Sequence, residues 1–417
     1  MKRFILILLA SLLTLGFVSC KKKTDDSSDT LAGSYDITMW VSEKEGVSEH
    51  FKEQIAAFMK ANPDIVINAR IEGVTEADVG SKIVADVATA PDIYCFAQDQ
   101  LARLVQAGAL MKLGKAAGER VSATNDASSV AAAKVSGTLY AYPITSDNGY
   151  FLYYDKSIMS DEQADSLEEI IAACERNGKK LRFALEDGWY TASFFFATGC
   201  HSDWTVGANG EFLSLDDNFN SPAGLVAMRG MQKLVKSSCY DSDADSFVDT
   251  GAIVTGIWNA DAAEKHFGEN LGATDLPSFT IDGKEYHLGS YTGNKLIGVK
   301  PQSDAKRSTV LSLLAEYLSG EECQRQRYDE LQWGPSNINV QRSDKVQANP
   351  SLAALSKQSE HGRPQGQVAG SWWDIVRVLG AEAKRAKDEG ELQAALDRYD
   401  RDISKWHNKA SKKAIGK

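Results

Sequence analysis

Residues 36–96 alternate between two kinds of hydrophobic spacing, and this alternation constrains the fold more than any other feature of the chain. Short apolar runs indicate three strands, at residues 36–40, 64–70 and 92–96. Between them, residues 47–58 and 76–88 carry apolar side chains every three or four positions, which is typical of helices with one buried face. The order strand, helix, strand, helix, strand predicts an α/β fold with a mostly parallel sheet covered by helices.

The rest of the chain continues in the same way and ends in helices. Further strands are predicted at residues 141–145, 150–154, 181–185, 251–258 and 295–300. Further helices are predicted at residues 166–177, 189–198, 221–237, 303–318, 321–331 and 371–409. Since ligands in such sheets bind beyond the carboxyl ends of the strands, side chains at strand ends are the first candidates for a site.

Composition excludes several classes of protein. The 417 residues, 43% of them hydrophobic, suffice for two or three domains and a sizeable core. Lys and Arg number 46 against 57 Asp and Glu, which gives a net charge of −11. This chain lacks the cationic excess needed to displace phosphate counterions, so we expect no nucleic-acid partner. Anionic ligands and anionic membrane surfaces are disfavoured for the same reason.

The N-terminus has the features of an export signal. Lys2 and Arg3 precede an apolar run over residues 4–18, which is too short for an ordinary membrane span and typical of a signal-peptide core. The sequence Phe-Val-Ser-Cys that ends this run resembles a bacterial lipobox, with Phe17 where the pattern prefers Leu. We therefore expect residues 1–19 to be a signal peptide and Cys20 to be lipidated. An ordinary signal peptide with a chance cysteine is the alternative.

The segment after Cys20 predicts a tether and the location of the protein. Residues 20–34 are mostly polar and charged, so we expect a flexible, lipid-anchored linker. The protein is then exported and held at the periplasmic or cell-surface face of a bacterial membrane. Five cysteines remain, and their odd number precludes complete internal pairing: Cys95, Cys174, Cys200, Cys239 and Cys323. We expect most of them to be small buried apolar side chains.

Motifs of catalysis and metal binding are weak or missing from the sequence. It contains no GxxxxGK[ST], no GxGxxG and no HExxH, and its six histidines are scattered. Asp241, Asp243 and Asp245 imitate the start of a calcium loop, but the required Gly and Glu are absent. A solvated acidic loop is the expectation there, and calcium is the alternative. No catalytic residue, cofactor or metal is expected.

Aromatic residues instead gather at the ends of predicted elements. Aromatic faces stack on the apolar C–H face of a sugar ring, while carboxylates, amides and amines bind its hydroxyls. The aromatic candidates for ligand binding are Phe96, Trp189, Tyr190, Trp258 and Trp373. The polar candidates beside them are Glu43, Lys44, Gln98, Asp99, Asp147 and Glu186. Each aromatic residue alone is better explained as core, but their joint placement favours a carbohydrate site.

Four stretches of the chain carry a resemblance to a known family. They are PDIYCFAQDQLARLVQAGAL, LYAYPI followed by YFLYYDKS, VTGIWNADAAEKHFGENLGATDLPSF, and GSWWDIVRVLG. Over most of residues 35–405 the chain resembles the extracellular solute-binding proteins of carbohydrate-importing ABC transporters, particularly maltose/maltodextrin-binding proteins. The resemblance implies a two-lobed α/β fold with a hinge of about three crossovers and an interlobe ligand cleft.

The resemblance also implies roles for individual residues. Trp258 and Trp373 fall on stacking tryptophans of the family, and Trp189 or Tyr190 falls on its aromatic pair. Phe96 stands where a maltodextrin binder has Trp, and Asp99 matches a hydroxyl-binding Asp. Among the remaining polar candidates, Gln98 replaces a histidine of the family and Asp147 lies near its Glu, offset by one residue. Glu43 and Lys44 lie in a loop that aligns with a gap.

The implied function is that of a solute-binding lipoprotein of an ABC importer. Lobe one is expected to comprise residues 35–145 and 295–340, and lobe two residues 146–294 and 341–417. Maltose, a maltodextrin or a related oligosaccharide would bind in the cleft of a monomer and pass to the permease subunits. A binder of another solute, such as a peptide, a polyamine or glycerol phosphate, is the alternative. An exported carbohydrate-active enzyme is a further one.

The first prediction concerns Cys20. Lipidation of its thiol should hold the protein in the membrane fraction, so a Cys20→Ala protein should leave that fraction for the soluble one. Detergent phase partitioning of the two proteins checks this. If the wild-type protein partitions into the aqueous phase, the cysteine carries no lipid.

Overall fold

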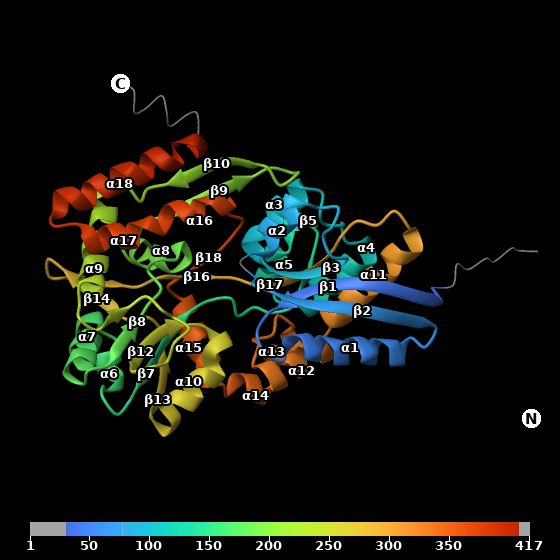
Figure 1. The fold of residues 1–417 in the computed structure, drawn as a ribbon, viewed down its shortest axis with the longest axis horizontal. Helices are drawn as coiled ribbons and strands as arrows, with labels where there is room; N and C mark the ends of the chain where they lie inside the picture. The colour runs from blue at the N-terminus through green and yellow to red at the C-terminus, as the bar shows by residue number, and fades with distance from the viewer. Residues whose placement is uncertain (1–30, 77, 408–417) are drawn as a thin grey trace, which may run out of the picture.

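The computed structural model describes residues 31–76 and 78–407, which form two lobes (Figure 1). Each lobe is built around a five-stranded sheet. The lipidation prediction for Cys20 lies outside the described residues. Within them, no helix combines the length and the apolar character that a membrane span needs.

The sheet of lobe one has the strand order β2-β1-β3-β17-β6. These strands are β1 (Gly33–Ser42), β2 (Ile65–Val74), β3 (Ile93–Ala97), β6 (Tyr142–Pro143) and β17 (Lys295–Val299). β1 pairs in parallel with β2 and β3, as the alternating pattern predicts. β17 runs antiparallel to both of its neighbours, β3 and β6.

Helices cover both faces of this sheet. They are α1 (Val47–Ala61), α2 (Val79–Ala85), α3 (Leu101–Gln106), α4 (Lys115–Thr124), α5 (Ala127–Ala132), α11 (Ala305–Leu318) and α12 (Glu321–Leu331), with a 3₁₀ turn η1 (Gln98–Gln100). Alternate residues of β3 enter different cores: Ile93 and Cys95 pack with α1 and α11, and Tyr94 and Phe96 pack with α2 and α3. A strand covered on both faces has no open side, which explains its continuous apolar run.

The sheet of lobe two has the order β11-β8-β12-β7-β13. Its strands are β7 (Phe151–Asp155), β8 (Lys180–Arg182), β11 (Tyr240–Asp241), β12 (Thr250–Thr255) and β13 (Leu271–Thr274). Two-stranded pairs flank it, namely β9 (Ser202–Val206) with β10 (Phe212–Asp217), β14 (Ser278–Ile281) with β15 (Lys284–His287), and β16 (Ser290–Thr292) with β18 (Gly362–Pro364). In lobe one, β4 (Lys134–Val135) pairs with β5 (Thr138–Leu139).

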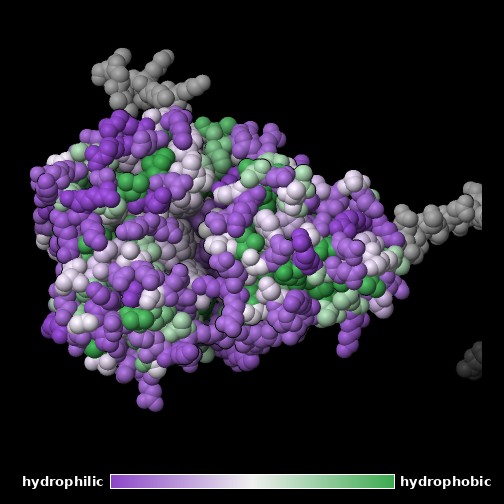
Figure 2. All heavy atoms as spheres, viewed as in Figure 1, coloured by the Kyte–Doolittle hydropathy of each residue, from purple (hydrophilic) through white to green (hydrophobic). Residues whose placement is uncertain are grey.

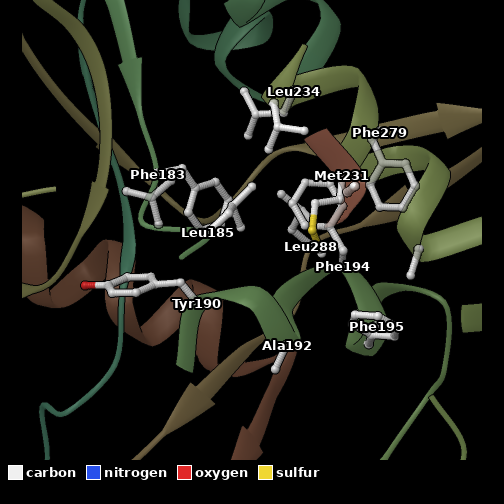
Figure 3. Close-up of a cluster of buried hydrophobic side chains, with 14 of the residues drawn as sticks. Phe183, Leu185, Tyr190, Ala192, Phe194, Phe195, Met231, Leu234, Phe279 and Leu288 are labelled. Atoms are coloured by element: carbon white, nitrogen blue, oxygen red, sulfur yellow. The ribbon is translucent and has the colours of Figure 1, made fainter. Parts of the chain in front are cut away.

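Helices of lobe two enclose a large apolar core. They are α6 (Asp161–Ala164), α7 (Leu167–Arg176), α8 (Gly188–Ala197), α9 (Pro222–Val235), α10 (Ala260–Phe267), α15 (Pro350–Ser359), α16 (Gly370–Val376), α17 (Val378–Arg385) and α18 (Glu389–Ile403), with 3₁₀ turns η2 (Ile257–Asn259), η3 (Gly268–Asn270) and η4 (Ser404–Trp406). Figure 3 shows part of this core, in which rings of α8 belong to the same cluster as Met231 and Leu234 of α9. The set of helices predicted over residues 371–409 consists of α16, α17 and α18.

Three passages of chain join the lobes, and they are bonded to one another. The passages are residues 144–149, residues 292–295 and the segment around α13 (Ile338–Gln341) and α14 (Asp344–Gln347). Asn148 N donates to Gly293 O at 3.1 Å, and Ser146 N donates to Gly334 O at 3.0 Å. The hinge is therefore a short hydrogen-bonded strap instead of a loose linker.

A buried arginine occupies the acidic loop that follows β11. The Arg182 guanidinium is 5% exposed and lies 3.1 Å from an Asp241 carboxylate oxygen. It also donates to the carbonyl oxygens of Asp243 and Val248 and to the Thr250 hydroxyl. The acidic loop is thus ordered around a cation of the chain itself, the Arg182 guanidinium.

All five described cysteines, Cys95, Cys174, Cys200, Cys239 and Cys323, are free and buried. This matches the expectation of small apolar side chains. Burial raises the pKa of the Cys95 thiol to about 12 and that of Cys323 to about 11, so both remain protonated and poorly reactive at neutral pH.

The second prediction concerns Arg182. An Arg182→Met substitution should lower the free energy of unfolding by about 3 kcal/mol or more, because it leaves Asp241, two backbone carbonyl groups and the buried Thr250 hydroxyl without their partner. Urea unfolding measures the loss. The matched control is Arg377→Met, since Arg377 is exposed and pairs with the exposed Asp374. Arg377→Met should change the free energy of unfolding by less than about 1 kcal/mol. Equal losses of stability in the two variants would contradict the role of Arg182.

Candidate functional site

The two lobes touch along a seam formed by η1 and α3 of lobe one and the segment leading into α16 of lobe two. Val368 N donates to Asp99 O at 3.2 Å, and Ala102 N donates to Gln367 Oε1 at 2.7 Å. The tip of the β9–β10 hairpin also reaches α3. A Cβ on Gly210, whose φ is +84°, would stand 2.1 Å from Ala102 O. A glycine there allows lobe two to approach the backbone of lobe one closely.

Aromatic rings of lobe two form a connected wall. The Trp189 ring lies 5.9 Å from that of Trp258 and 4.6 Å from that of Tyr150, between centroids. Both tryptophans are half-buried. The Trp189 Nε1 atom is buried and has no hydrogen-bond acceptor among the described residues. An unpaired buried donor is costly, so the wall presents a polar group that a bound hydroxyl could satisfy.

Local sequence fixes this wall in place. Asp187 caps α8 by accepting a hydrogen bond from Trp189 N at 2.9 Å. Gly188 lets α16 approach, since a Cβ there would stand 2.7 Å from Trp373 O. Trp258 does not end β12 as expected but lies in η2. Its ring folds back over Gly256, where a Cβ would lie within 2.1 Å of the indole.

Trp373 and Asp99 meet across the seam. The indole Nε1 of Trp373 donates to Asp99 Oδ2 at 3.2 Å, and the Trp373 ring meets Tyr291 edge to face at 5.5 Å. Burial raises the pKa of Asp99 to about 6, against the opposing effects of Arg103 and of the Trp373 hydrogen bond. The seam thus holds a carboxylate that is only partly compensated within the protein.

A second polar group lies beside the hinge. The Lys295 ammonium is buried, 3.3 Å from Glu76 Oε1 and 4.5 Å from the centre of the Trp333 ring. Burial opposes its protonation, but the charges of Glu76 and Asp147 outweigh this effect and raise the pKa of Lys295. Asp147 Oδ2 accepts a hydrogen bond from Gly334 N, whereas its Oδ1 is buried without a partner among the described residues.

Sequence reasoning missed Glu76 and Lys295. A lysine that opens an otherwise apolar run was the available signal, because a buried ammonium requires a carboxylate partner. The partner could not be named, since Glu76 lies far from Lys295 in the sequence.

The remaining polar candidates are dispersed. Gln98 is buried and accepts a hydrogen bond from Asn294 Nδ2 at 2.9 Å. Glu43, Lys44 and Glu186 are exposed. Lys44 Nζ lies 3.9 Å from Asp245 Oδ1 of the other lobe, so this pair bridges the lobes at the rim. Glu43 accepts a hydrogen bond from the Thr75 hydroxyl at 2.6 Å.

Two aromatic candidates belong to the cores. Phe96 has no exposed surface and packs between Tyr94 and the helices over β3. Its side chain cannot face a ligand in this structure, because the sheet is covered on both faces, and we remove it from the candidate wall. Tyr190 is 7% exposed. Figure 3 shows its hydroxyl directed away from the surrounding core side chains.

The surface is hollowed between the lobes (Figure 2). A cavity of about 1140 Å³ lies along the three passages and is lined by Gln98, Asn148, Gly293, Asn294 and Gly334, together with residues of α15. Trp189, Trp258 and Trp373 are not part of its lining. The structure therefore joins Trp373 and Asp99 at the seam and Trp189 with Trp258 in lobe two, and places Gln98 in the lining of the cavity at the hinge.

Comparisons with known proteins agree with this architecture. The family model described as bacterial extracellular solute-binding protein matches residues 53–354. The galactooligosaccharide-binding protein of Bacillus subtilis (strain 168) is 22% identical, over 93% of this chain and 95% of its own.

Two solved structures share the fold. The maltodextrin-binding protein of L. casei BL23 without ligand is 21% identical, with a TM-score of 0.76 over 89% of this chain and 99% of its own. A structure with acarbose is 26% identical, with a TM-score of 0.75 over 90% and 99% of the two chains.

The third prediction concerns the pH dependence that Asp99 introduces. Its pKa rises on folding from 3.8 to about 6, so the folded protein binds more protons than the unfolded chain between these values. The free energy of unfolding should fall as pH rises from about 4 to about 6. Asp99 should account for about 2 to 3 kcal/mol of this fall in the free energy of unfolding. An Asp99→Asn substitution should abolish that part of the fall. Asp217, whose pKa burial also raises to about 6, remains in both proteins.

Urea unfolding of the two proteins at several pH values, followed by tryptophan fluorescence, checks this. The difference between their unfolding free energies should grow across the window and stay constant above it. Parallel pH profiles would show that Asp99 is solvated in the free protein, and that the seam is open in solution.

Proposed function

Because the chain belongs to the bacterial extracellular solute-binding protein family, we propose that it is the solute-binding component of a carbohydrate ABC importer. Its ligand is a maltodextrin or a related oligosaccharide, bound between the lobes. The names of its relatives support this choice, since one is a galactooligosaccharide-binding protein and another a maltodextrin-binding protein. A further similar structure is described with acarbose.

The observation that carries the proposal is the contact between Trp373 of lobe two and Asp99 of lobe one. It places an indole ring and a buried carboxylate side by side, and Gly188, which precedes Trp189, packs against the backbone of Trp373. A pyranose offers C–H groups that stack on aromatic faces and hydroxyls that donate to a carboxylate. The chemistry of the seam therefore complements a sugar ring on both counts.

Closure follows from contacts to both lobes. A ligand stacked on Trp258 and Trp373 that also donates to Asp99 binds the closed form better than the open one, and so shifts the population toward closure. Its hydroxyls would replace the indole as the donor to the carboxylate. The boundaries expected from the sequence, 35–145 with 295–340 and 146–294 with 341–417, describe the two bodies that move.

The closed protein then presents its ligand to the permease subunits. We propose that it acts as an exported, lipid-anchored monomer, tethered through Cys20. No bond is made or broken in this function, so it requires no catalytic residue and no cofactor. The alternative of a carbohydrate-active enzyme would need a pair of carboxylates that act together, such as Glu186 and Asp187. In this structure Asp187 caps α8, whereas the Glu186 side chain is exposed and has no such role.

The fourth prediction concerns Trp258 and Trp373. Calorimetric titration should detect binding of maltotriose or a related oligosaccharide to the wild-type protein. Trp258→Ala and Trp373→Ala should each weaken it by about 2 kcal/mol, on the order of thirtyfold, through lost burial and stacking. The matched control is Phe96→Leu, which alters a core ring. It should lower the melting temperature and leave the affinity unchanged.

Other outcomes decide between the alternatives. Wild-type affinity in both folded tryptophan variants would contradict the stacking site. Saturable binding of a peptide, a polyamine or glycerol phosphate, with none of any oligosaccharide, would assign another solute. Release of reducing sugar during incubation with maltodextrin would identify an enzyme.

A further inference from the structure

Three potential metal ligands meet on the surface of lobe two, away from the interlobe seam. Asp275 follows β13, His287 ends β15, and His361 lies between α15 and β18. One ligand atom from each lies within 4.8 Å of those of the other two. The three segments are distant in sequence, so the cluster arises through the fold and not through a local motif.

A buried glutamine holds the three segments together. Gln358 has no exposed surface. Its side chain accepts a hydrogen bond from Leu276 N at 2.7 Å and donates to Leu288 O at 3.2 Å. Its own carbonyl oxygen accepts a hydrogen bond from His361 N at 3.0 Å. One residue therefore fixes the backbone next to Asp275 and His287 and also at His361.

The hydrogen bonds of His287 determine which of its ring nitrogens is free. Nδ1 lies 3.0 Å from Leu288 O, and an acceptor there requires Nδ1 to carry a proton. In the neutral ring, Nε2 then points a lone pair at Asp275 Oδ2, 3.1 Å away. Two acceptors that face each other need a cation or a proton between them. A histidine that donates one N–H to a backbone carbonyl and offers the other nitrogen is the common arrangement of a metal ligand.

His361 is the movable member of the cluster. Its ring stacks on that of His287 with centroids 3.6 Å apart and planes inclined by 18°. Stacked rings cannot both direct a lone pair to one ion, so binding requires His361 to turn about its side-chain bonds. It is exposed and free to do so. A cavity of about 390 Å³ lined by His287, His361 and Tyr286 gives access from solvent.

A lysine ammonium pairs with the carboxylate of the cluster. Lys357 Nζ lies 2.6 Å from Asp275 Oδ1 and is more than half exposed, so it can withdraw when an ion arrives. Its partner atom is Oδ1, whereas the atom that faces His287 is Oδ2. The carboxylate can therefore serve both neighbours through different oxygens.

We propose that Asp275, His287 and His361 form a binding site for a divalent ion of the zinc class. Two imidazole nitrogens and one carboxylate oxygen suit zinc, and a water completes four-coordination. The ion would tie the segment between α15 and β18, which follows the third passage, to the β14–β15 hairpin of lobe two. The site lies outside the proposed sugar site and does not depend on it.

The fifth prediction tests this with zinc itself. The full chain, purified without a histidine tag and treated with a chelator, is titrated with zinc chloride in a calorimeter. We expect one equivalent to bind and the melting temperature to rise. A His361→Ala substitution should weaken binding at least about tenfold, since loss of groups that merely support a ligand already costs that much. His361 is exposed, so this variant should fold normally.

A matched control and a spectrum separate the outcomes. His201→Ala removes a histidine beside Asp216 that is outside the cluster, and it should bind zinc like the wild type. Cobalt used as the probe should give weak visible bands without a thiolate charge-transfer band. The proposal is overturned by no zinc binding to the wild type, by unchanged affinity in His361→Ala, or by a thiolate band. The first of these would leave the His287–Asp275 contact as a proton-bridged ion pair.

Discussion

Lobe one is completed by a strand, β17, that the chain reaches after it has built most of lobe two. Its five residues pair with β3 on one side, and two of them, Leu296 and Ile297, pair with β6 on the other. The chain must therefore leave lobe one, return to it, and leave again, and the three passages come to lie side by side. Their mutual hydrogen bonds, such as Asn148 N to Gly293 O, follow from this return. The site between the lobes exists because both walls are anchored to the same strap.

Much of this fold could be predicted from hydrophobic periodicity. The parallel strands β1, β2 and β3 follow from short apolar runs, and the helices between them follow from apolar side chains every three or four positions. The direction and position of β17 do not, because an apolar run looks the same in either orientation. Trp258 was expected at the end of a strand, but Gly256 allows the chain to turn before it. This turn requires the Trp258 ring to fold back over Gly256, and the spacing of apolar residues in the sequence does not indicate such a contact.

The family resemblance named individual candidate residues for the site. Contacts between residues that are distant in the sequence could not be predicted, because only the fold brings such residues together. Trp373 and Asp99 meet at the seam, and Trp189 and Trp258 contact each other in lobe two; their part in binding a ligand stays a prediction. Phe96 was expected to face the ligand, yet its position on a strand covered from both sides buries it. The Glu76–Lys295 pair and the histidine cluster join segments far apart in the sequence, and their residues carry no local signal. Scattered histidines were accordingly interpreted as unrelated.

The loop around Arg182 has a consequence for the surroundings in which the protein can remain folded. Acidic loops of this kind are commonly ordered by dissolved calcium, and their order then varies with its concentration. Here the cation is covalently part of the chain, so its effective concentration at the loop is constant. Chelators and changes in the calcium concentration should leave the order of this loop unaffected. Dilution cannot remove the Arg182 guanidinium, which is the counter-ion of the acidic loop.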